Sequence, residues 1–374
     1  MTTRLFQVPG PKRFLHQLTR NLRDGRLCIL ALPEGAGDGL FESLRQDLGL
    51  GGFDLALLEA DQCCGSPAAW LLEKGGQEPP AEAGPAVSRL ASLAVGGVVW
   101  WLEGIARQSW PVWKDFLLRF EHACRQNCPW DRPRLVIVLR GDAATIEVPN
   151  EVGLSYQPWQ GILTPRDMEF YVDLVLDHQE DPSLEGALRV RLIAELAHWD
   201  ARLAEYLCEF TLEELATPAA VLAEFPGAER FRQPSSLPAR VGWAQGLVDL
   251  RGGRVIPHCL ATLQGPGLGE IPHRLWRAQV GTLLPVIEEE RLSLVTRYRN
   301  HFRVPWDTPV GPITNHLDLE IGYMDYQIRR YNLNLNSRIR RRIEVLKEAR
   351  NALAHQEPVA LHLLLALIGE QGPI

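Results

Sequence analysis

The stretch RLCILALPEGAGDGLFESLRQDLGL, residues 26–50, decides how the N-terminal part of the chain folds. Residues 27–32 are uniformly apolar, which is typical of a strand buried in a parallel sheet. Residues 33–39 are rich in glycine, and residues 40–50 show the apolar spacing of a helix. This order can hold a phosphate, because glycine lets backbone N–H groups approach an anion at the start of a helix.

The glycine-rich loop departs from the pattern that nucleotide hydrolysis requires. A loop of the GxxxxGK[ST] type places a lysine on the β- and γ-phosphates and a hydroxyl on magnesium. Here Gly39 is followed by Leu40 and Phe41, and Asp38 would repel a triphosphate. A tight turn between strand and helix is therefore the alternative to a nucleotide site.

Three further apolar runs, at 53–59, 97–103 and 134–139, alternate with helical or loop segments. This alternation predicts a three-layer α/β domain with a mainly parallel sheet. Glu103 and Arg140 follow two of these runs, at the carboxyl ends where open α/β sheets place ligand residues.

The order of elements in residues 1–163 resembles that of a P-loop ATPase domain that has lost its phosphate and magnesium chemistry. The resemblance implies a structural or regulatory role and makes ATP hydrolysis an unexpected activity. It also implies a residual set of nucleotide-binding residues, which comprises Gly35, Gly37, Gly39, Glu103 and Arg140.

The remaining chain divides into three predicted parts. Residues 164–235 contain periodic apolar positions and resemble the helical lid that follows the sheet in P-loop ATPases, with one long helix expected at 186–210 and a shorter one at 211–225. Residues 236–269 contain short strand-like pieces around a Gly252-Gly253 turn, which indicates a small hairpin or wing. Residues 270–374 are predicted to form a helical bundle.

The stretch RIRRRIEVLKEARNALAHQEP, residues 338–358, carries the chemistry of that bundle. Arg350 falls within an apolar stripe at helical spacing, and an unpaired buried guanidinium would cost several kcal/mol, so it needs a partner, an interface or an anionic ligand. Asn351 and His355 stand at i and i+4 on an adjoining face. The stripe consists of Ile339, Ile343, Leu346 and Leu353.

Arg350, Asn351 and His355 match the Arg-x(4–6)-His signature of HEPN domains, and residues 274–295 resemble the long first helix of such a domain. The resemblance covers roughly residues 270–374. HEPN domains are small helical bundles, and many are metal-independent ribonucleases. The resemblance implies that His355 serves as acid or base, that Arg350 clamps the phosphate, and that Asn351 orients one of them. A histidine that is simply solvated at a helix end is the alternative.

The formal net charge of −7 gives no general attraction to nucleic acid, so the distribution of charge matters more than its sum. Basic residues crowd into the region just before Arg350, as they would in a groove that follows an RNA backbone. A solvated helix face is the alternative. The candidate RNA-binding residues are Arg338, Arg341, Arg342 and Lys347.

Length and composition set the broad class. At 374 residues the chain should form two or three domains. No apolar run is long enough to cross a membrane, and the N-terminal residues lack the apolar run of a signal peptide, so a cytoplasmic protein without a membrane partner is expected. Seven cysteines fit a reducing compartment, and their spacing does not match a zinc site. The pattern predicts no metal and no cofactor.

These patterns together predict a HEPN-type endoribonuclease, the effector of a bacterial antiviral defence or toxin system, regulated by its degenerate ATPase-like region. Because residues five apart lie on different sides of a helix, a homodimer through the C-terminal bundle is expected to unite two motifs. Other defence proteins are further expected partners. The alternative is a non-catalytic dimeric scaffold or adaptor in which Arg350 pairs with a carboxylate such as Glu320.

Overall fold

The computed structural model of the chain describes residues 2–80, 83–93, 97–176, 183–232, 237–263, 269–309 and 311–369. The chain forms two compact units, each assembled from separate stretches. Unit 1 combines Met1–Tyr171, His198–Arg202 and Gln233–His258, and unit 2 combines Val172–Ala197, Leu203–Arg232 and Cys259–Ile374.

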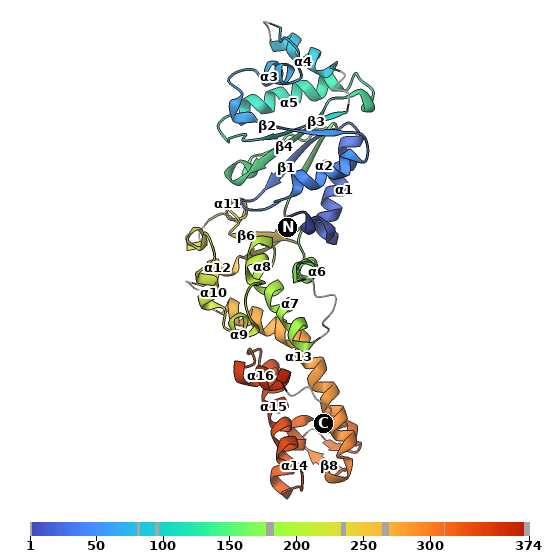
Figure 1. Cartoon of the computed structure of the whole chain (residues 1–374), viewed down its shortest axis with the longest axis vertical. Helices are drawn as coiled ribbons and strands as arrows, with labels where there is room; N and C mark the ends of the chain where they lie inside the picture. The colour runs from blue at the N-terminus through green and yellow to red at the C-terminus, as the bar shows by residue number, and fades with distance from the viewer. Residues whose placement is uncertain are drawn as a thin grey trace. The chain divides into compact units, whose positions relative to one another are not determined.

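Unit 1 is built on a five-stranded sheet in the order β2-β3-β4-β1-β5 (Figure 1). Every neighbouring pair in this sheet is parallel, as predicted from the apolar runs. Such runs arise because strands of a parallel sheet are covered on both faces. The strands are β1 Leu27–Leu32, β2 Asp54–Glu59, β3 Val98–Glu103, β4 Arg134–Arg140 and β5 Leu154–Pro158.

Helices cover both faces of the sheet, which gives unit 1 three layers (Figure 1). Trp100 of β3 packs with the buried residues of α3, α4 and α5, while its neighbour Trp101 meets Phe41 of α2 edge to face at 5.6 Å. Adjacent strand residues point to opposite faces, so the two tryptophans belong to different layers. The helices are α1 Pro9–Arg23, α2 Leu40–Gly49, α3 Pro67–Lys74, α4 Ala83–Ala91 and α5 Trp110–Cys124.

The carboxyl ends of three neighbouring strands meet at one edge of the sheet. Leu32, the last residue of β1, is aligned with Arg140, the last residue of β4. Glu103 ends β3 on the other side of β4. The sheet register therefore gathers the glycine-rich loop, Arg140 and Glu103 at the same edge.

The predicted hairpin is present and belongs to unit 1. Strands β6 Val248–Arg251 and β7 Arg254–Pro257 pair antiparallel around Gly252 and Gly253. Both glycines have positive φ, 56° and 76°, as a two-residue hairpin turn requires. The N–H of Gly161 donates a 3.0 Å hydrogen bond to Asp249, which links the hairpin to the segment after β5. The short helix α11 Ala239–Ala244 packs beside β6.

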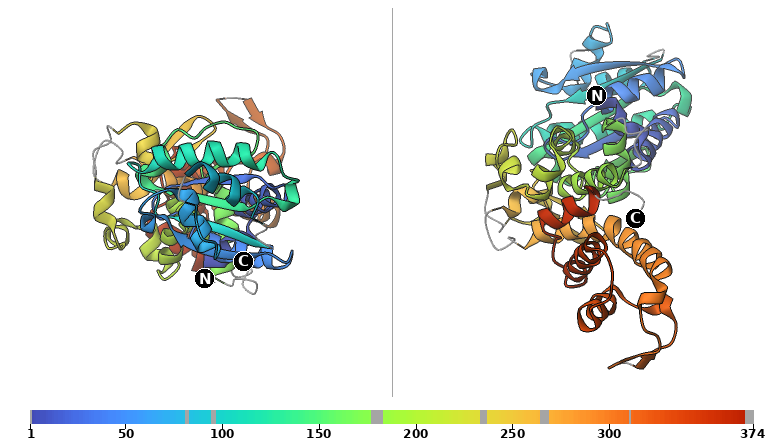
Figure 2. Two further views of the ribbon diagram at one scale, coloured as in Figure 1. Left: turned by 90° about the horizontal axis from the view of Figure 1, so that it is seen from above. Right: turned by 60° about the horizontal axis from the view of Figure 1, so that its bottom comes forward.

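Unit 2 is mainly helical, and helix α13 Glu270–Arg297 packs against α7 and α15. The orange and red ribbons of Figure 2 trace α13 to α16, and α15 also contacts α14 and α16. A small hairpin, β8 Trp306–Thr308 with β9 Gly311–Ile313, separates α13 from α14. The other helices are α7 Leu184–Ala197, α9 Leu212–Ala216, α10 Ala219–Ala223, α12 Cys259–Thr262, α14 Ile321–Tyr331, α15 Ser337–Ala354 and α16 Leu361–Gly369.

The units cut across the predicted domain boundaries. Two helices, α6 Pro165–Leu176 and α8 Ala201–Leu207, each contain a boundary between units. Helix α7, predicted in the lid, shares unit 2 with the C-terminal helices, because the buried Arg274 of α13 donates to the carbonyl of Leu196 at 3.2 Å. The boundary predicted at residue 235 lies outside the described residues.

Two predicted helices are each broken into two. Residues 186–210 form α7 and α8, separated around His198, whose φ of 55° is left-handed and cannot continue a right-handed helix. Residues 211–225 form α9 and α10, separated where Pro218 removes a backbone donor. No helix in the described ranges combines the length and the apolar character that crossing a membrane requires.

Candidate functional site

Helix α15 carries the predicted catalytic motif at its C-terminal end. The side chain of Asn336 accepts a 2.8 Å hydrogen bond from the N–H of Ile339 and so caps the first turn. His355 is the C-terminal cap, and Gln356 follows with a φ of 60°. The motif therefore lies on the last turn of a helix whose start is well defined.

The apolar stripe of α15 is buried within unit 2. Ile339, Ile343, Leu346 and Leu353 are all buried in the core. These side chains pack within one copy of the chain, so the stripe is not exposed to a second copy.

Arg350 forms an ion pair within the same unit. Its Nη2 donates a 2.9 Å hydrogen bond to Oε2 of Glu320, the residue that precedes α14. The side chains are 35% and 55% exposed, so water reaches both charges. An exposed pair of this kind contributes about 0–1 kcal/mol and exchanges readily. Glu320 is the carboxylate named in the scaffold alternative.

Asn351 and His355 are exposed at the end of α15. The N–H of His355 donates to the carbonyl oxygen of Asn351 at 3.0 Å, a backbone contact that continues the helical turn. Among the described residues, no hydrogen bond joins the side chains of Arg350, Asn351 and His355. The imidazole is thus accessible to a ligand from solvent.

Most of the basic residues before the motif are engaged in ion pairs. Lys347 holds Asp325 at 2.6 Å, and Arg341 holds Glu344 at 3.0 Å. Arg329 bridges the same two carboxylates at 3.0 and 3.2 Å. Charges of both signs line a pocket of about 540 Å³ between α14 and α15. This basic run is therefore a network of alternating charge, with much of its positive charge compensated.

Arg342 was predicted to contact RNA, but the structure shows that it is buried and joins helices of unit 2. It is 2% exposed, and its Nε and Nη2 donate to the two carboxylate oxygens of Glu290 at 2.6 and 2.7 Å. Its Nη1 donates to the carbonyl oxygen of Ala366 at 2.8 Å. A guanidinium satisfied in this way joins α13, α15 and α16 and is not available to a phosphate.

Arg338 is exposed in the first turn of α15. A positive charge there is opposed by the helix dipole, which favours anions at this end. A bound phosphate would relieve that repulsion. Of the four predicted RNA contacts, Arg338 and Arg341 are exposed, Lys347 is partly buried and Arg342 is buried.

In unit 1 the predicted nucleotide-binding residues lie together. Arg140 donates to the carbonyl oxygen of Ala36 in the glycine-rich loop at 2.8 Å, and its Nη2 lies 3.6 Å from Glu103. The same oxygen of Glu103, Oε1, accepts a 2.8 Å hydrogen bond from the indole of Trp101. Arg140 therefore ties the loop to the end of β3.

The glycine-rich loop needs its glycines for conformation and for space. Gly35, Gly37 and Gly39 have φ values of 74°, 76° and 79°, in the left-handed region. Within the described part of the chain, their N–H groups have no hydrogen-bond acceptor. A side chain at Gly35 would also collide with the guanidinium of Arg202.

Arg202 is a residue that sequence analysis missed. Its backbone N–H donates to Asp200 at 2.9 Å, and Asp200 lies 3.4 Å from the imidazole of the buried His258. These residues follow the helix break at His198, which brings the arginine to the loop. The sequence predicted one continuous helix at 186–210, and such a helix gave no reason to place Arg202 beside the glycine-rich loop. A prediction of the break at His198 would have been needed to find it.

The cysteines are free thiols. Burial raises the pKa of Cys124 to about 12, and burial raises the pKa of Cys208 to about 12 as well. Both thiols are therefore protonated and weakly nucleophilic at neutral pH. In the described ranges, no three His, Cys, Asp or Glu side chains gather as a metal site.

Comparison of the chain with protein-family models and with curated proteins finds no match.

Proposed function

We propose that this protein is a metal-independent HEPN-type endoribonuclease whose site is centred on Arg350 and His355. The observation that carries the proposal is the accessibility of His355 and Asn351 on the same last turn of α15 that holds Arg350. An imidazole can transfer a proton and a guanidinium can stabilise a phosphate, and cleavage by the RNA's own 2′-hydroxyl uses both of these roles.

The chemistry needs one proton acceptor and one stabilising cation. The 2′-oxygen forms a bond to the adjacent phosphorus while a base takes its proton, and negative charge builds on the phosphate oxygens. The P–O5′ bond then breaks, and the 5′-oxygen leaves with a proton from an acid, which gives a 2′,3′-cyclic phosphate and a 5′-hydroxyl. His355 is the proposed acid or base, and Arg350 is the proposed phosphate clamp. Asn351 is proposed to orient the phosphate or the imidazole.

The pair between Arg350 and Glu320 is compatible with this role if RNA replaces the glutamate. Both side chains are partly exposed, so a phosphate can compete for the guanidinium without entering a closed core. Glu320 would then act as a gate that holds Arg350 in place before RNA binds. Arg338 and Arg341 are the exposed cations proposed to follow the RNA backbone.

A homodimer remains part of the proposal. Residues five apart lie about 140° apart around a helix of 3.6 residues per turn, so a second copy is proposed to complete each site. The dimer is proposed to form through a surface of the C-terminal helices other than the buried stripe.

Unit 1 is proposed to regulate the nuclease as a degenerate P-loop ATPase-like domain. The parallel sheet, the glycine-rich loop after β1 and the gathering of Glu103 with Arg140 support this assignment. Two guanidinium groups, from Arg140 and Arg202, can attract an anion to the loop. The missing lysine and hydroxyl support regulation over hydrolysis. The resemblance further suggests an effector in bacterial antiviral defence or a toxin system.

A dimeric scaffold or adaptor is the second candidate function. The ion pair between Arg350 and Glu320 favours it, because a structural pair accounts for the arginine without any substrate. The charge network of Arg329, Arg341 and Lys347 favours it for the same reason.

An RNA cleavage assay in EDTA separates the two candidates. If the protein is the proposed ribonuclease, the wild type should cleave RNA, and Arg350→Ala and His355→Ala should not. His301→Ala replaces another exposed histidine of unit 2 and serves as the matched control. Cleavage that survives both motif substitutions contradicts the proposal. Calorimetry with ATP and ADP tests unit 1 separately, and heat that disappears in Arg140→Ala supports an anion site at the loop.

A further inference from the structure

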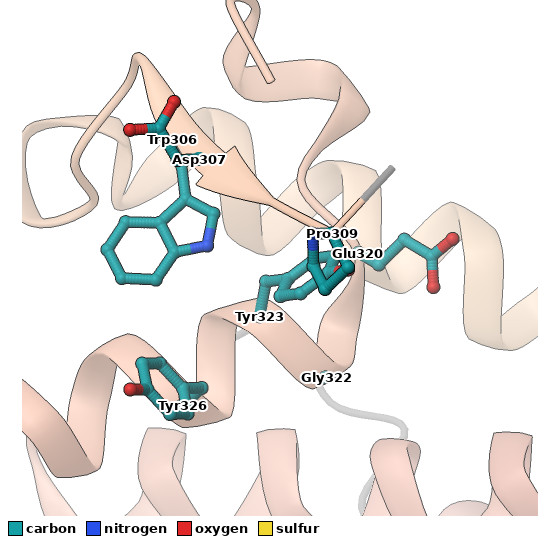
Figure 3. A pocket seen from close by; sticks show the side chains of 7 residues that line it. All are labelled: Trp306, Asp307, Pro309, Glu320, Gly322, Tyr323 and Tyr326. Atoms are coloured by element: carbon teal, nitrogen blue, oxygen red, sulfur yellow. The ribbon is translucent and has the colours of Figure 1, made fainter. Parts of the chain in front are cut away.

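A pocket of about 480 Å³ lies in unit 2 between the β8–β9 hairpin and helix α14 (Figure 3). It is open to solvent, and aromatic rings dominate its walls. Figure 3 shows the rings of Trp306 and Tyr326 on one side and Tyr323 beside Pro309 on the other. The lining residues are Trp306, Asp307, Pro309, Glu320, Gly322, Tyr323 and Tyr326.

The aromatic walls come from two regular elements. Tyr323 and Tyr326 are three residues apart on α14 and therefore lie on one side of the helix. Trp306 of β8 meets Tyr326 with ring centroids 5.8 Å apart and planes inclined by 58°. Tyr326 is 53% exposed. Aromatic surface left in water at a pocket is typical of a binding site.

The charged groups of the lining are carboxylates, and one of them, Glu320, is already paired with Arg350 at 2.9 Å. Asp307 and Glu320 line the pocket, and within the described part of the chain its lining holds no Lys, Arg or His. Figure 3 shows both carboxylates directed away from the rings, at the margin of the pocket. There Asp307 attracts cations by its field, and neither carboxylate fills the aromatic space.

A cation–π contact already exists beside the pocket, between Arg303 and Tyr331. Arg303 lies over the ring of Tyr331 at 3.8 Å, and Tyr331 also meets the ring of Trp306, with centroids 6.0 Å apart. Of the two tyrosine rings that contact Trp306, Tyr331 is thus covered by a cation, and Tyr326 is 53% exposed. The same physical attraction, between a positive charge and the negative faces of the rings, is available at Tyr326.

We propose that this pocket binds a cationic side chain, arginine or lysine, presented by a protein partner. Inclined rings form the walls of a site for a compact charge, whereas a flat nucleobase prefers rings that it can stack upon in parallel. An RNA strand would also bring its phosphates close to Asp307. This inference does not require ribonuclease activity, although the pocket shares Glu320 with the proposed ribonuclease site, where that residue pairs with Arg350.

The test follows the indole N–H resonance of Trp306 in the full-length protein by NMR, assigned by its absence in Trp306→Phe. The probes are acetyl-Gly-Arg-Gly-amide and acetyl-Gly-Lys-Gly-amide, with the norleucine peptide as the uncharged control. The cationic peptides should shift the resonance in a saturable way, and the norleucine peptide should not. Equal shifts with all three peptides, or none with the cationic ones, would overturn the proposal.

Variants connect the binding to the pocket. Tyr326→Ala should weaken binding of the cationic peptides about twofold to fivefold, as loss of one ring face implies. Asp307→Asn should weaken it and reduce its dependence on salt, whereas Asp318→Asn, an exposed carboxylate outside the lining, should leave it unchanged. Circular dichroism checks that each variant is folded. Unchanged binding in folded Tyr326→Ala overturns the proposal.

Two alternative occupants serve as further arms of the experiment. An oligouridylate that shifts Trp306 while the cationic peptides do not would identify an RNA-base site in place of the proposed one. Spermidine that binds while both peptides fail would show that the pocket takes small polyamines, which also contradicts a protein partner. Binding of the peptides with competition by spermidine supports the proposal.

Discussion

Arg350 donates its 2.9 Å hydrogen bond to Glu320, a residue thirty positions earlier in the chain, and both side chains are partly exposed to water. Solvent screening limits the stability that such a pair provides. A double-mutant cycle with Arg350→Ala and Glu320→Gln should give a coupling energy of no more than about 1 kcal/mol. Urea unfolding of the four proteins measures it. A coupling of several kcal/mol would mean that the pair is a structural core element.

The same pair predicts an effect on RNA binding. If Glu320 and a phosphate compete for Arg350, then Glu320→Gln should bind RNA more tightly than the wild type. The comparison is made in a His355→Ala background, by fluorescence anisotropy, so that cleavage does not interfere. Weaker binding in the glutamine variant would show that Glu320 does not compete with RNA.

Arg342 should be essential for folding and uninformative about RNA. Removing one partner of its buried pair with Glu290 leaves an uncompensated charge, so Arg342→Ala should lower the free energy of unfolding by about 3–5 kcal/mol. Arg338→Ala, in an exposed position of the same helix, should change it by less than about 0.5 kcal/mol. Denaturant titration of both variants checks this contrast. A stable Arg342→Ala would contradict the structural role.

Arg338 should instead report on the RNA backbone. Loss of one phosphate contact with a single strand should reduce the slope of log K against log salt concentration by about 0.7. The binding titrations are repeated at several salt concentrations for the wild type and Arg338→Ala. An unchanged slope would remove Arg338 from the proposed RNA path.

The glycine-rich loop provides a pair of matched substitutions. Gly35→Ala should destabilise unit 1 by about 1–3 kcal/mol, because its φ of 74° is strained for alanine and its Cβ would meet the guanidinium of Arg202. Gly49→Ala, at a helical position with open space, should stabilise by about 0.4–1 kcal/mol. Thermal unfolding distinguishes the two. Arg202→Ala, added to Gly35→Ala, should remove the collision with the guanidinium and restore part of the lost stability. The part that is due to backbone strain at residue 35 should stay lost.

Asp249 should give unit 1 a defined pH dependence. Burial raises the pKa of its carboxyl, against the opposing effects of the Gly161 N–H and the Arg251 charge. The pKa of Asp249 in the folded state exceeds the unfolded value of 3.8. The free energy of unfolding of the wild type should therefore fall relative to that of Asp249→Asn as pH rises from 3.8 to the folded-state pKa. Urea unfolding from pH 3.5 upward measures the difference. Asp54→Asn, a substitution at an exposed carboxylate, is the control for the loss of one negative charge.

The sequence predicted the sheet well and the units poorly, for a physical reason. A strand that is covered on both faces has a continuous apolar run in its sequence, so β1 and β4 could be predicted from local sequence alone. The break at His198 was not visible, since the flanking residues keep helical spacing and a left-handed φ leaves no mark in composition. The association of α7 with α13 depends on contacts such as Arg274 with Leu196, which no local pattern encodes.

The candidate site shows the same division. The spacing of Arg350, Asn351 and His355 predicted that one helix carries them, and the ends of two apolar runs predicted that Glu103 and Arg140 lie at the carboxyl edge of the sheet. Burial was not predictable within the basic run. Arg341 and Arg342 are adjacent and alike in sequence, yet one faces solvent and the other is paired with Glu290, because a helix turns about 100° between them.

The chain passes from one unit to the other after Tyr171, Ala197, Arg202, Arg232 and His258. Deletion analysis of this protein is therefore hazardous. A fragment that ends at residue 163 lacks the segment bearing Arg202 and the β6–β7 hairpin, and a fragment that begins at residue 270 lacks α7, the neighbour of its first helix. Inactivity of either truncation would report incomplete folding, so point substitutions in the intact polypeptide are the sounder genetic tool.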